Sequence, residues 1–154
     1  MKLVIVSDNH GRIDVLKQIV SAHPDADAYI HCGDSELSKE QIAPFITVNG
    51  NNDRYYIHPE LLVLPIQQFK ILLLHGHQMN LFKRLDLLTH KAHQLGCKIV
   101  CYGHTHIFSV ETKSGVTMIN PGSLYYNRDG TTASYAIAYV DPQGNLEHVQ
   151  RMEG

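Results

Sequence analysis

Five apolar runs in the first two thirds of the chain end in the same way, with a glycine close to an aspartate, histidine or asparagine. Apolar runs of this kind are typical of strands that are buried on both faces of a sheet. Because ligands of open α/β sheets bind beyond the carboxyl ends of the strands, we expect the five ends to meet at one site. The ends are Ser7-Asp8-Asn9-His10-Gly11, His31-Cys32-Gly33-Asp34, Asn49-Gly50-Asn51-Asn52-Asp53-Arg54, His75-Gly76-His77 and Gly103-His104-Thr105-His106.

Helices are predicted between several of the early strands, whereas the later strands follow one another through turns. The apolar periodicity predicts helices over 12–22, 36–43 and 81–95, and Gly96 ends the last of them. Strands are predicted at 2–7, 28–32, 45–49, 69–75, 98–102, 106–112, 116–120, 134–140 and 146–152. This order favours an α/β fold of two packed sheets flanked by helices, in a single domain over 1–154.

The charge and hydropathy of the chain exclude several classes of protein. Its 154 residues carry 13 basic and 15 acidic side chains, and the net charge of -2 predicts no long nucleic-acid partner. No apolar run approaches the roughly 18 residues that span a bilayer, and the run over 1–7 is too short for a signal peptide. We therefore expect a cytoplasmic protein with no membrane partner, in which Cys32, Cys97 and Cys101 are reduced and mostly buried.

Asp8 with His10, and His104 with His106, are pairs of metal-ligand side chains two residues apart at their strand ends. Residues at this spacing project to one side of an extended segment, so a single segment can offer two ligands. Singly, each candidate is equally typical of a turn or a helix cap, but together they favour a metal site. Together the five ends offer seven good candidate ligands, which are carboxylates, imidazoles and an amide.

This ligand set predicts the number and type of metal ions. Carboxylates, imidazoles and an amide oxygen suit manganese, iron, nickel or zinc. Seven ligands exceed what one tetrahedral ion uses, which favours two ions that share one carboxylate. Asp34 is alone at its strand end and is the natural bridge. We expect two divalent ions, manganese first, with nickel, iron and zinc as alternatives.

The ordered motifs resemble those of the calcineurin-like metallophosphoesterases. They are Asp8-x-His10, Gly33-Asp34, Gly50-Asn51-x-Asp53, His75 and Gly103-His104-x-His106. The short chain, the Gly50-Asn51-Asn52-Asp53 variant and Asn120-Pro121-Gly122-Ser123 are similar to the small YfcE-type phosphodiesterases. The resemblance implies a four-layer α/β/β/α sandwich of two mixed β-sheets. It also implies that one metal is held by Asp8, His10, Asp34 and His106, and the other by Asp34, Asn51, His75 and His104.

The resemblance implies a binuclear metal-dependent phosphodiesterase, in which a metal-bridging hydroxide attacks the phosphorus of a small phosphodiester such as a nucleotide. Two alternatives stay open: a phosphomonoesterase, and a non-catalytic protein-binding scaffold like the retromer subunit of this superfamily. Scaffold members have lost key ligands, whereas all seven positions are filled here. A homo-oligomer is compatible with the sequence.

Asn52 departs from the wider superfamily, in which a histidine after the ligand asparagine is thought to protonate the leaving group. An amide cannot act as a general acid near neutral pH, so Asn52 favours diesters with good leaving groups. His77 is an alternative donor and is equally typical of a solvated loop. Asn9, Asn52 and Arg54 are further candidate substrate contacts, although Asn9 is equally typical of a turn and Arg54 more typical of an exposed loop.

Overall fold

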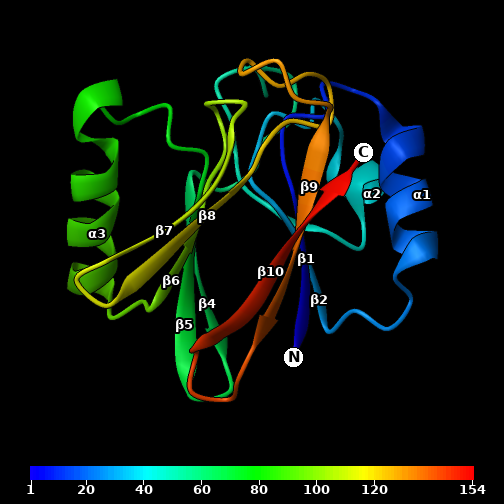
Figure 1. Ribbon diagram of the computed structural model, residues 1–154. Helices are drawn as coiled ribbons and strands as arrows, with labels where there is room; N and C mark the ends of the chain where they lie inside the picture. Colours follow the sequence, from blue (N-terminus) through cyan, green and yellow to red (C-terminus); the bar gives the residue numbers. More distant parts are fainter.

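The computed structural model describes residues 1–154 and contains two five-stranded mixed sheets packed face to face (Figure 1). The strand orders are β10-β9-β1-β2-β3 and β4-β5-β6-β8-β7. The strands are β1 (Lys2–Val6), β2 (Ala28–His31), β3 (Ile46–Thr47), β4 (Leu61–Ile66), β5 (Phe69–Leu74), β6 (Ile99–Cys101), β7 (Phe108–Lys113), β8 (Val116–Pro121), β9 (Ser134–Val140) and β10 (Leu146–Glu153). The helices are α1 (Ile13–Ala22), α2 (Lys39–Ile42), the short 3-10 helix η1 (Leu81–Lys83) and α3 (Arg84–Leu95).

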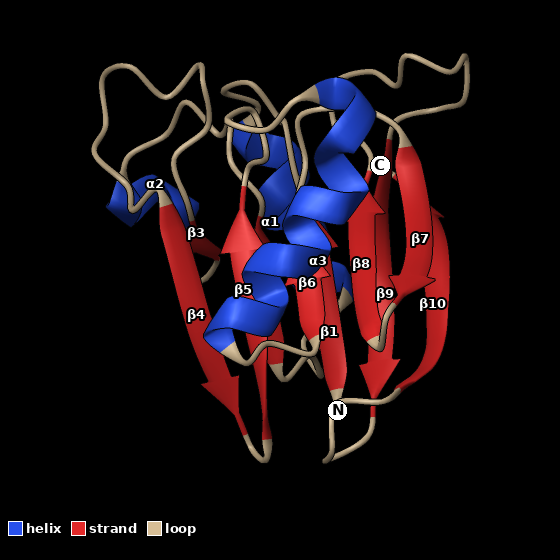
Figure 2. Cartoon of the chain, turned by 90° about the vertical axis from the view of Figure 1, so that its left-hand side faces the viewer, coloured by secondary structure: helices blue, strands red, loops and turns tan.

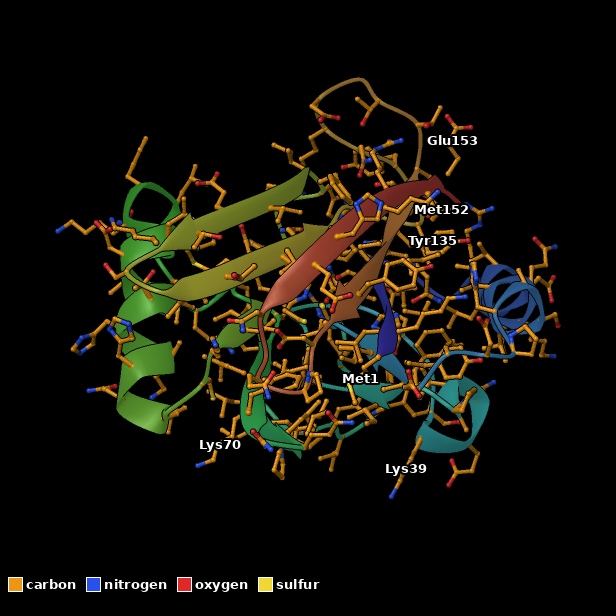
Figure 3. All side chains as sticks on the ribbon, turned by 60° about the horizontal axis from the view of Figure 1, so that its bottom comes forward. Met1, Lys39, Lys70, Tyr135, Met152 and Glu153 are labelled. Carbon is orange, nitrogen blue, oxygen red and sulfur yellow. The ribbon has the colours of Figure 1, made fainter.

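Alternate residues of the central strands face opposite layers, and this alternation builds the sandwich. In β1, Leu3 and Ile5 pack in the core between the sheets, whereas Val4 and Val6 pack in the cluster that contains α1. Tyr135 of β9 also lies on the α1 side of its sheet (Figure 3). The second sheet divides its side chains in the same way between the central core and α3, which covers its outer face (Figure 2). The predicted α/β/β/α sandwich is confirmed.

Parallel pairing brings the carboxyl ends of the ligand-bearing strands to one edge of the sandwich. Strands β1, β2 and β3 are parallel in the first sheet, and β5, β6 and β8 are parallel in the second. The loops that follow these strands gather at the top of the molecule in Figure 1, away from the β9–β10 turn. The fold therefore assembles the loops that carry the predicted ligands.

Strand β4 was not predicted from the sequence. The segment Leu61–Ile66 is apolar without alternation and contains Pro65, which lacks the backbone N–H that a central strand uses. Because β4 lies at the edge of its sheet, Pro65 is tolerated there. The second predicted helix is also shorter than expected, because it begins only after Ser38, whose side chain caps it by accepting from the backbone of Gln41.

The predictions for the end of α3 and for the cysteines are confirmed. α3 ends at Gly96, which takes the left-handed conformation with φ of 70°. Cys32, Cys97 and Cys101 are free and buried. None of the helices combines the length and apolar character needed to cross a membrane.

Candidate metal centre

The structure brings the seven predicted ligands together at the edge of the sandwich where the parallel strands end. Asp8, after β1, lies at the middle: its Oδ1 is 3.1 Å from His106 Nε2, 3.8 Å from His75 Nε2 and 4.0 Å from His10 Nε2. His75 Nε2 is also 3.4 Å from Asp34 Oδ2. Segments that are far apart in sequence therefore place carboxylate oxygens and imidazole nitrogens around one point.

Asn51 and His104 complete the cluster on the side of His75. The Oδ1 atom of Asn51 is 3.1 Å from His75 Nε2 and 3.1 Å from His104 Nδ1. Imidazole nitrogens and carbonyl oxygens are both ligand types that divalent ions accept. The set therefore contains two carboxylates, four imidazoles and one amide.

Two groups of ligand atoms are close enough for each to hold a metal ion, and both contain Asp8. One group is Asp8, His10 and His106, and the other is Asp8, Asp34 and His75; within each group the atoms lie within 4.8 Å of one another. The sequence predicted Asp34 as the shared carboxylate. In the structure, Asp8 is common to both groups, and the bridging role of Asp34 stays a prediction.

The second nitrogen of three histidines is bound in a way that orients the first. His75 Nδ1 is 2.7 Å from the carbonyl oxygen of Cys32, and His106 Nδ1 is 3.1 Å from that of Tyr126. His10 Nδ1 is 2.8 Å from a carboxylate oxygen of Glu36. Each of these oxygens can accept from an Nδ1–H, which is the tautomer that leaves the Nε2 facing Asp8 available to a metal ion. The residues present therefore fit a metal centre.

The backbone at the candidate ligands is strained. Five of them are non-glycine residues with a left-handed backbone, which costs roughly 1–2 kcal/mol per residue. Strain of this kind persists where the surrounding structure holds it and is concentrated at functional sites. The five φ angles are 54° at Asp8, 45° at His10, 58° at Asp34, 69° at His104 and 57° at His106.

Two glycines leave room for the carboxylates. A Cβ atom on Gly50 would overlap the Asp34 side chain and lie 2.5 Å from its backbone nitrogen. A Cβ atom on Gly103 would overlap the side chain of Ser7 and lie 2.8 Å from Asp8 Oδ2. These two positions require glycine because the backbone of one strand end passes directly against the ligand of another.

The two central carboxyl groups are ionised despite their burial. Burial alone would raise the pKa of Asp8, but the hydrogen bond with His106 and the charge of His75 outweigh it and lower that pKa. The pKa of Asp34 is lowered in the same way, against the effect of burial, chiefly by His75. Burial, together with the nearby charge of His75, lowers the pKa of His104 to about 4, so its imidazole is neutral at ordinary pH.

An open cavity of about 250 Å³ lies over the cluster. Its size is at the small end for ligand pockets, which favours a small substrate or one that extends into solvent. It is lined by His10, Asp34, Asn51, Asn52, His104, His106, Tyr125, Tyr126 and Arg128.

The four predicted substrate contacts differ in their position relative to the cavity. Asn52 lines the cavity, and its backbone N–H and side-chain amide each donate to an oxygen of Asp34, both at 2.8 Å. Asn9 is fully buried outside the cavity lining, where its amide bonds His31 and the backbone of Arg12. Arg54 is exposed and does not line the cavity.

His77 lies beside the cluster without lining the cavity. Its ring centroid is 5.4 Å from that of His75 and 6.2 Å from that of His104. Its Nδ1 atom is buried and has no hydrogen-bond partner. His77 is therefore close to the centre but is not one of the residues that line the cavity.

Asp53 holds the Asp34 turn, a role that was not predicted from the sequence. Asp53 Oδ2 accepts the backbone N–H of Asp34 at 2.9 Å and that of Gly50 at 2.7 Å, and its Oδ1 accepts that of Glu36 at 2.7 Å. Asp53 thereby joins two strand ends that carry ligands. Its position in the Gly50-Asn51-x-Asp53 motif was the sequence signal from which this role could have been predicted.

Arg128 was also missed, although it lines the cavity. It lies in the segment after β8, which runs parallel to β6 and therefore ends at the same edge of the sheet. The rule that ligands bind beyond the carboxyl ends of parallel strands applies to this sixth end as it does to the other five.

The sequence profile of the calcineurin-like phosphoesterase superfamily domain matches residues 1–143. The chain belongs to this superfamily. A relative from Bacillus subtilis named "Probable metallophosphoesterase YsnB" is 39% identical over 144 residues, which cover 92% of this chain and 85% of the relative. A crystal structure of a predicted phosphoesterase from Streptococcus pneumoniae superposes with a TM-score of 0.80 at 26% identity, covering 98% of this chain and 96% of that one.

More distant structures share the fold. An archaeal phosphodiesterase has a TM-score of 0.75 at 22% identity and covers 99% of both chains. Vps29 from Entamoeba histolytica, solved in complex with zinc, has a TM-score of 0.75 at 22% identity, covering 99% of this chain and 98% of that one. The phosphoesterase YfcE from E. coli has a TM-score of 0.65 at 18% identity, covering 97% of this chain and 98% of that one. The expected resemblance to this group is confirmed at the level of fold.

Proposed function

We propose that this metallophosphoesterase is a phosphodiesterase that uses two divalent metal ions to hydrolyse small phosphodiesters. The observation that carries the proposal is the double group of ligand atoms around Asp8, with imidazole nitrogens already oriented toward it. All seven candidate ligands are present, which favours an enzyme over a scaffold that has lost them.

The residues divide into two ligand sets. One ion would be held by Asp8, His10, Asp34 and His106, and the other by Asp34, Asn51, His75 and His104. When bound, two divalent ions supply an acidified water and polarise the phosphoryl oxygens. The donor set admits manganese, nickel, iron and zinc, and we propose manganese as the working ion.

The protein side chains prepare the site for this chemistry. The backbone carbonyls of Cys32 and Tyr126 hold the rings of His75 and His106 in position. Asn52 binds both oxygens of Asp34 and so keeps its carboxylate oriented toward His75. Positioning of this kind reduces the reorganisation needed when a substrate arrives.

The amide of Asn52 also supports a phosphodiesterase over a phosphomonoesterase. Asn52 lines the cavity but cannot give a proton to a departing alkoxide near neutral pH. Substrates whose leaving group departs without protonation are therefore favoured. The structural neighbour described as an archaeal phosphodiesterase supports the same assignment.

The protein-binding scaffold remains the second candidate, since Vps29 shares the whole fold. We favour a small substrate, such as a nucleotide, because the cavity is small and the net charge of -2 offers no track for a long nucleic acid. Self-association and a cytoplasmic location stay predictions.

The test is hydrolysis of bis(p-nitrophenyl) phosphate and p-nitrophenyl phosphate by metal-stripped protein resupplied with Mn, Ni, Fe, Zn or Mg. We expect metal-restored cleavage of the diester and little cleavage of the monoester. Asp8→Asn should lower turnover by more than about 100-fold, since changes behind the ligands alone typically lower activity 10–100-fold. Asp14→Asn, an exposed carboxylate on α1, is the matched control.

Three results would overturn the proposal. Equal activity with and without metal would refute the metal centre. Full activity of Asp8→Asn would refute the assignment of the ligands. Inactivity with every ion, in protein shown to be folded, would favour the scaffold.

A further inference from the structure

The connection between β8 and β9, residues 122–133, forms one wall of the cavity and is bound to the Asp8 turn. Ser123 Oγ donates to the carbonyl oxygen of Asp8 at 2.9 Å, and Leu124 N–H donates to that of Ser7 at 3.0 Å. The same Ser123 hydroxyl accepts the backbone N–H of Tyr125 at 2.9 Å. The wall is therefore fixed to the strand end that carries the central carboxylate.

Asn127 holds the wall from its other side. It is buried, its Oδ1 accepts the N–H of Ser123 at 2.8 Å, and its Nδ2 donates to Thr132 O at 2.8 Å and Ser134 Oγ at 2.9 Å. A buried network of hydrogen bonds is not needed merely to form a surface loop. The hydrogen bonds fix the backbone on both sides of Tyr126, so the side chains that the wall presents to the cavity are positioned in advance.

Two tyrosines on this wall present half-exposed rings beside the metal ligands. Tyr125 is 53% exposed and its ring centroid lies 5.6 Å from that of His10. Tyr126 is 48% exposed and its ring centroid lies 5.0 Å from that of His106. The two tyrosine rings meet edge to face at 5.6 Å. Aromatic rings that are half free at the edge of a cavity offer a surface on which another flat ring can pack.

Arg128 adds a cation at the same edge. Its backbone N–H donates to His106 O at 2.9 Å, which places the residue beside the ligands. Its side chain is exposed, forms no ion pair with a carboxylate, and has only a long contact of 3.5 Å from Nη1 to His104 O. It is the one permanently charged cation among the lining residues. A free guanidinium fork matches two oxygens of a phosphate.

We infer that Arg128 binds the non-bridging oxygens of the substrate phosphate while Tyr125 and Tyr126 contact an aromatic group on it. The substrate class is then a phosphodiester that carries a flat aromatic ring, such as a nucleobase. This inference rests on the proposed phosphodiesterase function, and it names residues that determine specificity without ligating metal.

A binding measurement tests the aromatic contact independently of turnover. The ligands are AMP and ribose 5-phosphate, which share a phosphate and a ribose and differ only in the base, titrated calorimetrically into the manganese-loaded protein. We expect AMP to bind about 5–150-fold more tightly. Tyr125→Ala/Tyr126→Ala should remove this difference, and Tyr125→Phe/Tyr126→Phe should keep it. Tyr55→Ala, on an exposed tyrosine outside the cavity, is the matched control.

The guanidinium has its own pair of variants. Arg128→Gln should weaken AMP and ribose 5-phosphate equally, by about 10–150-fold, because both lose the same bond to phosphate. Arg54 is an exposed arginine outside the cavity, so Arg54→Gln should change the affinity for neither ligand.

A second tyrosine variant covers the case in which the alanine pair at 125 and 126 unfolds. Tyr125→Leu/Tyr126→Leu keeps the apolar bulk and removes only the rings.

The outcomes separate this inference from the proposed function. Equal affinity for AMP and ribose 5-phosphate, in protein that cleaves bis(p-nitrophenyl) phosphate, overturns the aromatic contact and leaves the phosphodiesterase standing. A base-dependent affinity that the tyrosine variants abolish supports the contact, and absence of any hydrolysis then counts against the phosphodiesterase alone. Arg128→Gln with unchanged affinity for both ligands overturns the role of Arg128.

Discussion

Asp53→Asn is the substitution that most directly tests how the fold holds its ligands. Asp53 is 6% exposed, and its carboxylate accepts backbone N–H groups from Asp34, Gly50 and Glu36. The asparagine oxygen can replace the carboxylate oxygen that serves Asp34 and Gly50. Its NH2 group would then face the N–H of Glu36, and two donors cannot bond each other.

The loss can be estimated from these three bonds. The N–H of Glu36, which is partly buried, loses its acceptor at a cost of about 1–3 kcal/mol, and each of the other two bonds weakens by about 1 kcal/mol when its acceptor becomes neutral. The free energy of unfolding should therefore fall by about 3–5 kcal/mol, a large part of the 5–15 kcal/mol of a typical domain. At about 2–4 °C per kcal/mol, the melting temperature should fall by about 6–20 °C.

The assay is urea and thermal unfolding of the metal-free protein, followed by titration with Mn²⁺. Because the Asp34 turn relaxes, we expect manganese affinity to fall as well. Asp141→Asn is the matched control: Asp141 also accepts two backbone N–H groups, from Gln143 and Asn145, but in a solvent-exposed turn where water can replace it. If Asp53→Asn loses less than about 1 kcal/mol, or no more than Asp141→Asn, the reasoning is refuted.

Three further perturbations have defined outcomes. Gly50→Ala should lower metal affinity at least about 10-fold, because its Cβ overlaps the Asp34 side chain; calorimetry that shows unchanged affinity would contradict the close packing. Asn52→His should raise turnover of diesters with poor leaving groups by about 100-fold relative to p-nitrophenyl diesters, and an unchanged ratio would point to another donor such as His77. Burial lowers the pKa of His31 to about 3, so the unfolded state, with a pKa near 6.5, binds a proton first as the pH falls. Stability should then decline between about pH 6.5 and 3, by up to about 1.4 kcal/mol per pH unit for this group, and urea unfolding of His31→Gln at pH 7, 6 and 5 should show a shallower decline than the wild type.

The sequence alone determined the order of most elements and where the ligands lie along the chain. Apolar periodicity and turn residues are local signals, so α3 ends at Gly96 as predicted. The ligand-bearing ends could be placed at one site because parallel strands direct their carboxyl ends to one edge. The edge strand β4 was missed because Pro65 argues locally against a strand, and only its place at the sheet edge makes it compatible.

Tertiary structure decided which atoms meet. Asp8 is common to the two groups of close ligand atoms, because side-chain distances depend on how the two sheets pack, and the bridging role of Asp34 stays a prediction. Asn9 is a buried partner of His31. The arginine that lines the cavity is Arg128, from a sixth strand end, and not Arg54, the predicted substrate contact. Residue type and spacing predict which groups are available for chemistry. Their partners come from segments up to about a hundred residues away, and only the packed sandwich specifies them.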